Sequence, residues 1–262
     1  MLGDYGQFKK SIYNLTQIDL SAYKENQMRR RIDTLIAKNN VLSYATYVDL
    51  LKKDKQKMEQ FINFLTINVS EFYRDADQWK IIREKAIPEL LHRFGKNLKI
   101  WSAACSTGDE PYSLVMELSR YMPLHQIRVI ATDIDKQVLN AARIGIYKDK
   151  SIAGVPLEWK QKYFIKKGDS YQISNEIKSR VEFREHNLLK DAYPSDCHLI
   201  VCRNVMIYFT EEAKFEIYKK FNKSLVNNGI LFIGSSEQIL DFRSLNFYRK
   251  NACFFSKVDE IK

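Results

Sequence analysis

The stretch from Leu98 to Ser113 constrains the fold of this chain more than any other. It opens with a short apolar segment and continues through small residues to Gly108, and Pro111 then stands in the first turn of an expected helix. Strand, tight turn and helix in this order begin a nucleotide-binding α/β sheet, where ligands bind at the carboxyl ends of parallel strands. Small side chains let a ligand approach the backbone, and Gly108 can adopt the positive φ that such a turn requires.

The charges in this turn point away from a dinucleotide ligand. A pyrophosphate site has three spaced glycines and no nearby carboxylate, whereas Asp109 and Glu110 stand where the helix begins. Acidic residues at this place suit a ligand with an amino group and a sulfonium, such as S-adenosylmethionine. Acids in a first helical turn also complement the helix dipole, so both interpretations stay open.

Length and composition set the class of protein. A chain of 262 residues can hold one sizeable domain and a smaller one, and 45% hydrophobic with 28% charged residues is typical of a soluble globular protein. No segment reaches the length of a membrane helix, and the first ten residues lack the apolar core of a signal peptide. The net charge of +10 fits nucleic acid, an anionic membrane or an acidic protein equally.

The cysteines and histidines do not indicate a metal site. The cysteines have no metal-ligand spacing, and the histidines are scattered; the cysteines are Cys105, Cys197, Cys202 and Cys253. We expect free thiols in a reducing cytoplasm and no metal.

Residues 8–93 are expected to be entirely helical. Four apolar faces recur at helical spacing, made by Phe8, Ile12, Leu15 and Ile18, by Met28, Ile32, Leu35 and Ile36, by Tyr44, Tyr47, Val48 and Leu51, and by Met58, Phe61, Ile62 and Leu65. The second of these helices carries the consecutive cations Arg29, Arg30 and Arg31. They form either a solvated basic face or a docking surface for an acidic partner.

A polar segment follows these helices. Thr66, Asn68 and Ser70 alternate in a way that ends one helix and caps the next, with Asn68 or Ser70 expected as the cap. Capping does not explain the aromatic pair and cation at 72–74. A helix from Asp77 to Phe94, kinked at Pro88, is expected to lead into the central strand.

The second strand of the expected sheet, 127–133, ends in Asp133. A carboxylate at this tip accepts hydrogen bonds from both ribose hydroxyls of a bound nucleoside. The alternative is that Asp133 caps the next helix, although Asp135 fits that position better.

An inserted subdomain, 147–180, separates the second strand from the third and contains an expected β-hairpin around Gly168. Insertions at such positions often carry substrate-specific parts. The remaining strands are expected at 181–186, 198–202 and 230–234, with a helix from Glu211 to Leu225 stopped by Gly229. The tail from Phe247 to Phe255 is expected to add the last antiparallel strands.

Five sequence blocks carry a resemblance to a known family. They are residues 66–74, 102–113, 131–135, 186–189 and 202–209. In this order they resemble the CheR family, S-adenosylmethionine-dependent methyltransferases that esterify glutamates of bacterial chemoreceptors. The resemblance implies a Rossmann-like class I methyltransferase sheet with an all-helical amino-terminal domain and an inserted small antiparallel β-subdomain. The domains would be 1–94, helical with a linker helix, and 95–262, catalytic, which includes the insertion.

The resemblance also implies the cofactor site. Its residues would be Asn68, Ser70, Arg74, Glu110, Asp133, Asn187, Leu188, Arg203 and Asn204. Glu110 would hold the amino end of the methionine moiety and Arg74 would lie near its carboxylate, while Asp133 takes the ribose and Asn187 with Leu188 the adenine. S-adenosylhomocysteine would be the product. The family's β-subdomain can bind a receptor tether, but the single glycine of this hairpin, Gly168, argues against that here.

The expected partner is the cytoplasmic helical domain of chemoreceptors, and the enzyme would be a monomer in the bacterial cytoplasm, without nucleic acid or membrane insertion. The resemblance favours the docking interpretation of Arg29, Arg30 and Arg31. Tyr208 is expected to contact the incoming carboxylate or the methyl group, with Arg74 as a second catalytic candidate; a core position for Tyr208 is the alternative.

Four other functions compete with this one. A methyltransferase acting on another acidic protein, on RNA or on a small molecule would share the fold, as would a non-catalytic regulator that binds the cofactor. Families that methylate amino groups of bases use a Pro-Pro-aromatic turn after the fourth strand, whereas this chain has Arg203-Asn204-Val205.

Overall fold

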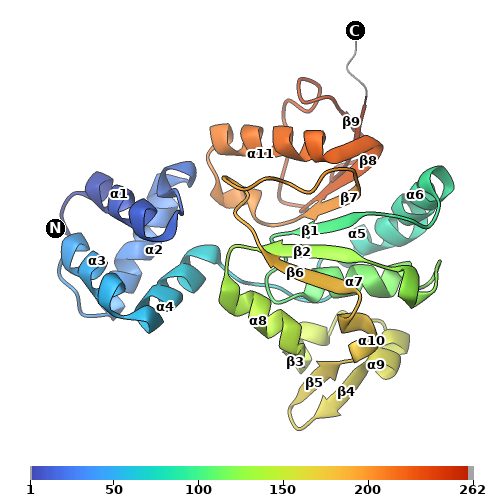
Figure 1. Ribbon diagram of the computed structural model, residues 1–262, viewed down its shortest axis with the longest axis horizontal. Helices are drawn as coiled ribbons and strands as arrows, with labels where there is room; N and C mark the ends of the chain where they lie inside the picture. Colours follow the sequence, from blue (N-terminus) through green and yellow to red (C-terminus); the bar gives the residue numbers. More distant parts are fainter. Residues whose placement is uncertain (1, 259–262) are drawn as a thin grey trace. The chain divides into compact units, whose positions relative to one another are not determined.

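The computed structural model describes residues 2–258 and contains a group of helices, a seven-stranded sheet and a three-stranded sheet (Figure 1). Contacts within the chain divide these residues into two compact units, 2–68 with Met206–Ile217, and Val69–Val205 with 218–258. Residues 69–94, which the sequence places with the amino-terminal helices, group with the sheet. No helix in the described part is long and apolar enough to span a membrane.

The first unit contains four amphipathic helices and two short 3₁₀ turns, together with the beginning of α11 (Glu211–Ser224) as far as Ile217. The four helices and two turns are α1 (Tyr5–Thr16), η1 (Leu20–Ala22), α2 (Glu25–Lys38), α3 (Tyr44–Lys53), α4 (Lys55–Thr66) and η5 (Met206–Tyr208). The Phe8 ring lies 4.8 Å from the Tyr44 ring and 6.4 Å from the Phe61 ring, which joins α1, α3 and α4. The expected helices are therefore confirmed.

The prediction that Leu15 belongs to the apolar face of α1 is wrong. Leu15 is 37% exposed, whereas Phe8 and Ile12 are buried. The chain turns at Gln17, which has a φ of 60°, so the last turn of α1 leaves the core and the buried Ile18 enters it instead.

The second unit carries a mostly parallel sheet in the order β6-β2-β1-β7-β8-β10-β9. Its parallel strands are β1 (Ile100–Ala103), β2 (Val129–Asp133), β6 (Val181–Glu185), β7 (Cys197–Cys202) and β8 (Leu225–Ile233). The tail adds β9 (Phe247–Arg249) and β10 (Phe254–Lys257) antiparallel, as expected. Because β1 lies between β2 and β7, their carboxyl ends meet at one edge.

Helices lie on both faces of this sheet (Figure 1). Helices α7 (Asp109–Leu118) and α8 (Lys136–Ile144) pack against β2 and β6, and η3 (Leu124–Gln126) precedes β2. On the other face, Phe221 of α11 (Glu211–Ser224) packs 5.4 Å from the ring of Trp101.

The helical run before the sheet is α5 (Ala76–Ile81), the π-helical η2 (Ile82–Ala86) and α6 (Ile87–Phe94). A kink is expected at Pro88, and the hydrogen-bond pattern changes to π-helical in the turn that ends two residues before it. Proline has no N–H for the carbonyl four residues earlier, so the hydrogen bonds rearrange around it.

The insertion folds as a separate antiparallel sheet, β3 (Ile146–Lys148), β5 (Ser170–Ile173) and β4 (Phe164–Lys167), which Figure 1 shows beyond α8. Short helices η4 (Asp149–Ile152), α9 (Leu157–Tyr163) and α10 (Asn175–Lys178) complete it. The expected hairpin is confirmed, since Lys167 pairs with Ser170 across Gly168, which has a φ of 56°. Strand β3 carries no sequence signal of its own.

The expected glycine stop after α11 is wrong. The helix ends at Ser224, β8 begins at once at Leu225, and the positive φ of 63° belongs to Asn228. Gly229 serves close packing instead, because a Cβ there would lie 2.9 Å from the Val226 carbonyl oxygen and 3.0 Å from that of Cys197.

Candidate cofactor site

The turn after β1 is held in an unusual backbone conformation. Ala104, Ser106 and Gly108 have φ values of 62°, 48° and 88°, so two residues other than glycine lie in the left-handed region. Gly108 confirms the expected positive φ, and a Cβ there would also lie 2.9 Å from the Cβ of Ala142. Glycine is therefore required at 108 both by the backbone conformation and by close packing against Ala142.

Asp133 at the tip of β2 holds this turn. Its carboxylate accepts the Ser106 N–H at 2.8 Å and the Asp135 N–H at 3.0 Å, and the residue is only 6% exposed. Burial raises the pKa of the Asp133 carboxyl to about 6, although the backbone N–H groups oppose this. Asp135, not Asp133, caps α8 by accepting the Gln137 N–H, so the capping interpretation of Asp133 is wrong.

Glu110 faces the sheet. Its carboxylate accepts the Ser102 hydroxyl at 2.8 Å and lies 3.7 Å from Nη1 of Arg203. Burial raises the pKa of Glu110, and the Arg203 cation opposes that shift. Helix α7 has Gly108 at its N-cap and no side-chain capping hydrogen bond, so Glu110 is not a capping residue of its own helix.

Asp109 has different surroundings from Glu110. It is fully buried, its carboxylate accepts the Thr107 hydroxyl at 2.5 Å, and the Ser70 side chain lies beside it. Burial raises the pKa of Asp109, while the hydroxyls of Thr107 and Ser70 lower it. Asp109 thus joins the turn after β1 to the segment before α5.

Arg203 follows β7 and is almost fully buried. Its Nη2 donates to the Arg74 carbonyl at 2.7 Å and to Asp75 at 2.8 Å, and its guanidinium lies 4.8 Å from the centre of the Phe232 ring. Asn204 has a φ of 59°, and a Cβ on Gly234 would lie 2.9 Å from its N atom. Close packing around Asn204 therefore requires glycine at 234.

The segment between α4 and α5 is irregular, and the expectation that Asn68 or Ser70 caps the next helix is wrong. Helix α5 has Asp75 at its N-cap, with a φ of 62° and no side-chain capping hydrogen bond. Asn68 donates instead to the Thr66 hydroxyl at 2.8 Å, and Arg74 Nη1 donates to the Val69 carbonyl at 3.1 Å. The spacing of polar residues gave a wrong cap because the side chain of Asn68 bonds to Thr66 and not to an N–H group of α5.

Asn187 and Leu188 form the turn after β6. The Asn187 N–H donates to Asp191 at 2.7 Å, and its side-chain oxygen accepts the Leu189 N–H at 3.0 Å. The Leu188 carbonyl accepts the Tyr193 hydroxyl at 2.7 Å. This network fixes the turn and leaves Leu188 8% exposed.

One compact unit holds most of the expected site: Ser70, Arg74, Glu110, Asp133, Asn187, Leu188, Arg203 and Asn204. Asn68, Tyr208 and the three arginines of α2 belong to the other unit. Sequence reasoning missed Ser102, Asp75 and Tyr147, which hold Glu110, Arg203 and the turn after β1. Only Ser102, a polar residue in an apolar strand, carried a signal.

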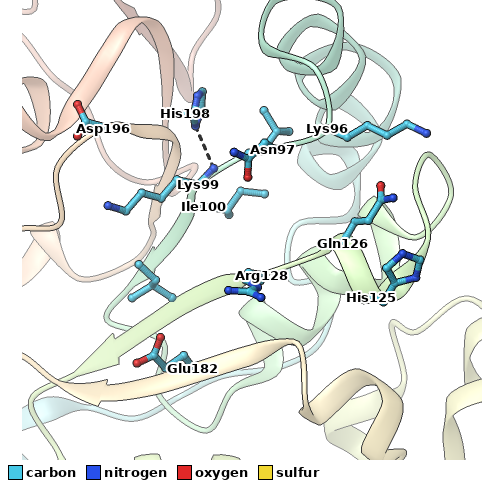
Figure 2. Close-up of a pocket in the computed structure, with 12 residues that line it drawn as sticks. Lys96, Asn97, Lys99, Ile100, His125, Gln126, Arg128, Glu182, Asp196 and His198 are labelled. Carbon is cyan, nitrogen blue, oxygen red and sulfur yellow. Dashed lines mark hydrogen bonds between the residues drawn. The ribbon is translucent and has the colours of Figure 1, made fainter.

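A cleft of about 830 Å³ opens at the amino ends of the strands (Figure 2). Lys99, Arg128, Glu182 and His198 are among the residues that line it. His198 Nδ1 accepts the Lys99 N–H at 2.9 Å, and burial lowers the pKa of its imidazole. Ligands of this fold bind at the carboxyl ends, so this cleft is not the cofactor site.

The residues at the carboxyl ends fit S-adenosylmethionine. The Asp133 carboxylate would accept ribose hydroxyls, Glu110 would supply negative charge for a cationic end, and the buried Ser106 Oγ and Arg203 Nε lack hydrogen-bond partners within residues 2–258. Within the same residues, no cluster of His, Cys, Asp and Glu could hold a metal ion. This sheet and edge define the class of Rossmann-like, S-adenosylmethionine-dependent methyltransferases.

Comparison with known proteins gives the particular family. The profile "CheR methyltransferase, all-alpha domain" matches residues 3–66, and "CheR methyltransferase, SAM binding domain" matches residues 68–252. A chemotaxis protein methyltransferase of Listeria innocua is 40% identical over 254 residues, 97% of each chain. Those of Borreliella burgdorferi and Pseudomonas aeruginosa (methyltransferase 1) are both 32% identical, over 92% and 90% of each chain. The chain belongs to the CheR methyltransferase family and is an enzyme that binds S-adenosylmethionine.

Proposed function

We propose that this enzyme transfers the methyl group of S-adenosylmethionine to glutamate side chains of chemoreceptors and so forms methyl esters. One observation carries the proposal: both family profiles match in order and together reach from residue 3 to 252. The relatives that match nearly end to end are named chemotaxis protein methyltransferases. A receptor glutamate is the acceptor that this relationship supports best.

The chemistry makes modest demands on the protein. A glutamate carboxylate is already ionised at neutral pH, because its ordinary pKa is about 4.3, so no general base is needed. S-adenosylmethionine, when bound, supplies an electrophilic methyl group. The protein must hold the acceptor carboxylate in line with that group, and such alignment can contribute about 7–11 kcal/mol.

We assign the cofactor contacts to the residues at the carboxyl ends of the strands. Asp133 would accept both ribose hydroxyls, and Glu110 would attract the amino end of the methionine moiety. Arg74 would lie near its carboxylate, while Asn187 and Leu188 would meet the adenine. Asn68, Ser70, Arg203 and Asn204 would complete the site. Their support is the resemblance of these positions to the family's motifs.

Receptor docking is assigned to a groove beside α2. It measures about 450 Å³ and is lined by basic, polar and apolar side chains, which are those of Lys24, Gln27, Met28, Arg30, Arg31, Thr34, Phe64, Ile67 and Tyr208. Because receptor helices that carry methylated glutamates present acidic side chains, the charges are complementary. Tyr208, which lines this groove, is the candidate for contact with the incoming carboxylate, with Arg74 as the second catalytic candidate.

The three arginines of α2 have different environments. Arg30 is exposed and lines the groove. Arg31 is half-buried, donates to the Phe64 carbonyl and lies 4.7 Å from the centre of the Phe64 ring. Arg29 lies 5.3 Å from the centre of the Tyr5 ring. We therefore propose Arg30 as the main receptor contact and a structural role at the end of α4 for Arg31.

The partner is proposed in finer terms as the cytoplasmic helical domain of the receptor, with the enzyme acting as a monomer in the bacterial cytoplasm. A purified cytoplasmic receptor fragment should then be methylated in the absence of membranes. Sedimentation of the enzyme should give a single species near the chain mass of 30.9 kDa. Methylation that requires intact membranes would contradict this choice of partner.

The decisive experiment uses methyl-labelled S-adenosylmethionine and membranes that contain chemoreceptors. Alkali-labile label in the receptor band is expected, because carboxyl methyl esters hydrolyse in base. Receptors with the candidate glutamates replaced by alanine are the matched control and should stay unlabelled. Alkali-stable label, or label in RNA, would overturn the proposal.

A further inference from the structure

Two segments that build the cofactor edge rest on the inserted subdomain. One is the turn after β1, residues 103–108, and the other is the segment 69–75 before α5. Both contact the same side chain of the insertion, Tyr147 on β3, which is 5% exposed. The sequence indicates only a substrate-specific role for an insertion at this place.

The first contact is a hydrogen bond. The Tyr147 hydroxyl donates to the Thr107 carbonyl at 2.7 Å. Thr107 lies between Ser106, whose φ is 48°, and Gly108, whose φ is 88°, and Ala104 has a φ of 62°. Non-glycine residues rarely adopt this region, so the turn keeps its shape only while its hydrogen bonds hold it.

The second contact is aromatic. Phe72 is 1% exposed, and its ring meets the rings of Tyr147 and Phe164 edge-on at 4.8 and 5.3 Å. Its N–H donates to the Ser151 carbonyl at 3.0 Å. A Cβ on Gly154 would lie 2.7 Å from the Phe72 carbonyl oxygen. The insertion therefore contacts both the ring and the backbone of Phe72. This packing explains why an aromatic residue stands at 72, which helix capping does not explain.

We infer that Tyr147 is a positioning residue for S-adenosylmethionine. It holds the turn after β1 through the Thr107 carbonyl and the segment 69–75 through the Phe72 ring, and these two segments build the cofactor edge. Without its hydroxyl, the Thr107 carbonyl loses its partner, and the turn spends less time in the conformation that binds. Apparent affinity falls by the fraction of molecules that lose this conformation. The inference rests on the assignment of this edge to S-adenosylmethionine.

The test compares Tyr147→Phe with Tyr171→Phe in the full-length enzyme. Tyr171 pairs directly with Tyr147 across β3 and β5, and its hydroxyl forms no hydrogen bond within residues 2–258, so it is a matched control. The dissociation constant of S-adenosylhomocysteine is measured by calorimetry. One neutral hydrogen bond corresponds to about a two- to tenfold change, and an increase in this range is expected only for Tyr147→Phe.

Kinetics separate positioning from a general loss of fold. Tyr147→Phe should raise the KM for S-adenosylmethionine by the same factor as the dissociation constant, with kcat and the KM for receptor unchanged. Hydrogen exchange should quicken at the amides of 105–108 and not in β1. Should Tyr147→Phe fold poorly, Gly154→Ala, which pushes on the Phe72 carbonyl, should show the same pattern.

Unchanged affinity in Tyr147→Phe, or an equal loss in Tyr171→Phe, would overturn the inference while leaving the proposed function intact. Failure of the parent enzyme to bind S-adenosylhomocysteine would overturn both. A fall in kcat with an unchanged KM would also overturn it, because a positioning role for the cofactor acts on binding.

Discussion

Nη2 of Arg203 lies 2.8 Å from Oδ2 of Asp75, a residue 128 positions earlier in the chain. The contact ties the end of β7 to the segment before α5, while Nη1 of the same guanidinium lies 3.7 Å from Glu110. Arg203 is thus shared between two carboxylates that come from different parts of the sequence. Its position makes it a link within the site as well as a candidate contact for the cofactor.

Arg203→Met should destabilise the fold more than Asp75→Asn does. Removing the cation leaves Glu110 with no opposite charge in a mostly buried position, and loss of one partner of a buried ion pair costs about 3–5 kcal/mol. Asp75→Asn keeps the bond from Arg203 to the Arg74 carbonyl and should cost about 1 kcal/mol. Urea unfolding measures both free energies. Equal losses would contradict the link between Arg203 and Glu110.

Asp133→Ala should weaken binding of S-adenosylhomocysteine by about 1.5–3 kcal/mol, because a charged acceptor of hydrogen bonds is lost. Asp133→Asn is the milder variant, since its amide oxygen still accepts one bond. Calorimetry on both variants checks the order of their affinities. Asp135→Asn is the comparison variant, because it changes the cap of α8 and the charge near Asp133 but keeps the Asp133 carboxylate itself. An unchanged affinity in Asp133→Ala would remove the ribose assignment.

Adenosine binding should weaken as the pH falls through about 6. Since the raised pKa of Asp133 is about 6, roughly a tenth of this carboxyl stays ionised at pH 5, and affinity should drop by up to about tenfold from its value at pH 7.5. Adenosine lacks the methionine end, so protonation of Glu110 does not enter.

The contribution of Asp133 to folding stability changes with pH in the opposite direction to its contribution to adenosine binding. Its folded-state pKa lies above the ordinary value of about 3.9, so the native state binds more protons between pH 4 and 6, and this group favours folding more as the pH falls. Binding should therefore be lost without unfolding caused by this group. A pH profile that persists in Asp133→Asn would assign the titration to another residue.

Glu110→Gln should separate the two ends of the ligand. The variant keeps a hydrogen-bond acceptor for Ser102 but loses the charge that we assign to the cationic amino end of the ligand. S-adenosylhomocysteine should bind about tenfold more weakly, as for a lost charged hydrogen bond, whereas adenosine affinity should stay within about twofold. Equal losses for both ligands would make Glu110 a purely structural residue.

The arginines of α2 should give distinct phenotypes. Arg30→Ala should raise the KM for receptor by about two- to fivefold, as expected for an exposed charge pair, without a change in thermal stability. Arg31→Ala should lower the free energy of unfolding by about 1–3 kcal/mol, because the Phe64 carbonyl loses its donor. Arg29→Ala tests the third arginine of the helix, whose guanidinium contacts the Tyr5 ring and the Tyr44 side chain.

Salt provides a second check on docking. Exposed charges are screened beyond about 8 Å at physiological ionic strength, so the difference between Arg30→Ala and the parent should shrink as salt rises. Cofactor affinity should not change in any of the three variants. Receptor methylation that ignores salt, with all three variants equal to the parent, would return Arg29, Arg30 and Arg31 to a solvated helix face.

Local patterns in the sequence determined the elements of this protein and several of its key residues. Apolar spacing specifies the four amino-terminal helices, because a helix buries every third or fourth residue whatever its partner. The order of strand, small turn and helix specifies the edge that binds the ligand, and it places Asp133 and Glu110 there. The positive φ of Gly108 is predictable from the same turn, because it depends on the local backbone and not on distant segments.

Only the tertiary structure determined the hydrogen-bond partners of several polar side chains. Ser70 lies beside Asp109 rather than capping a helix, Arg31 binds a carbonyl of α4, and Tyr147 reaches Thr107 from the insertion. Each of these side chains has several chemically equivalent partners within its own segment. Selection among them depends on which distant segments the sheet brings together, and a hydrogen bond across 40 residues, such as that of Tyr147, leaves no periodic trace in the chain.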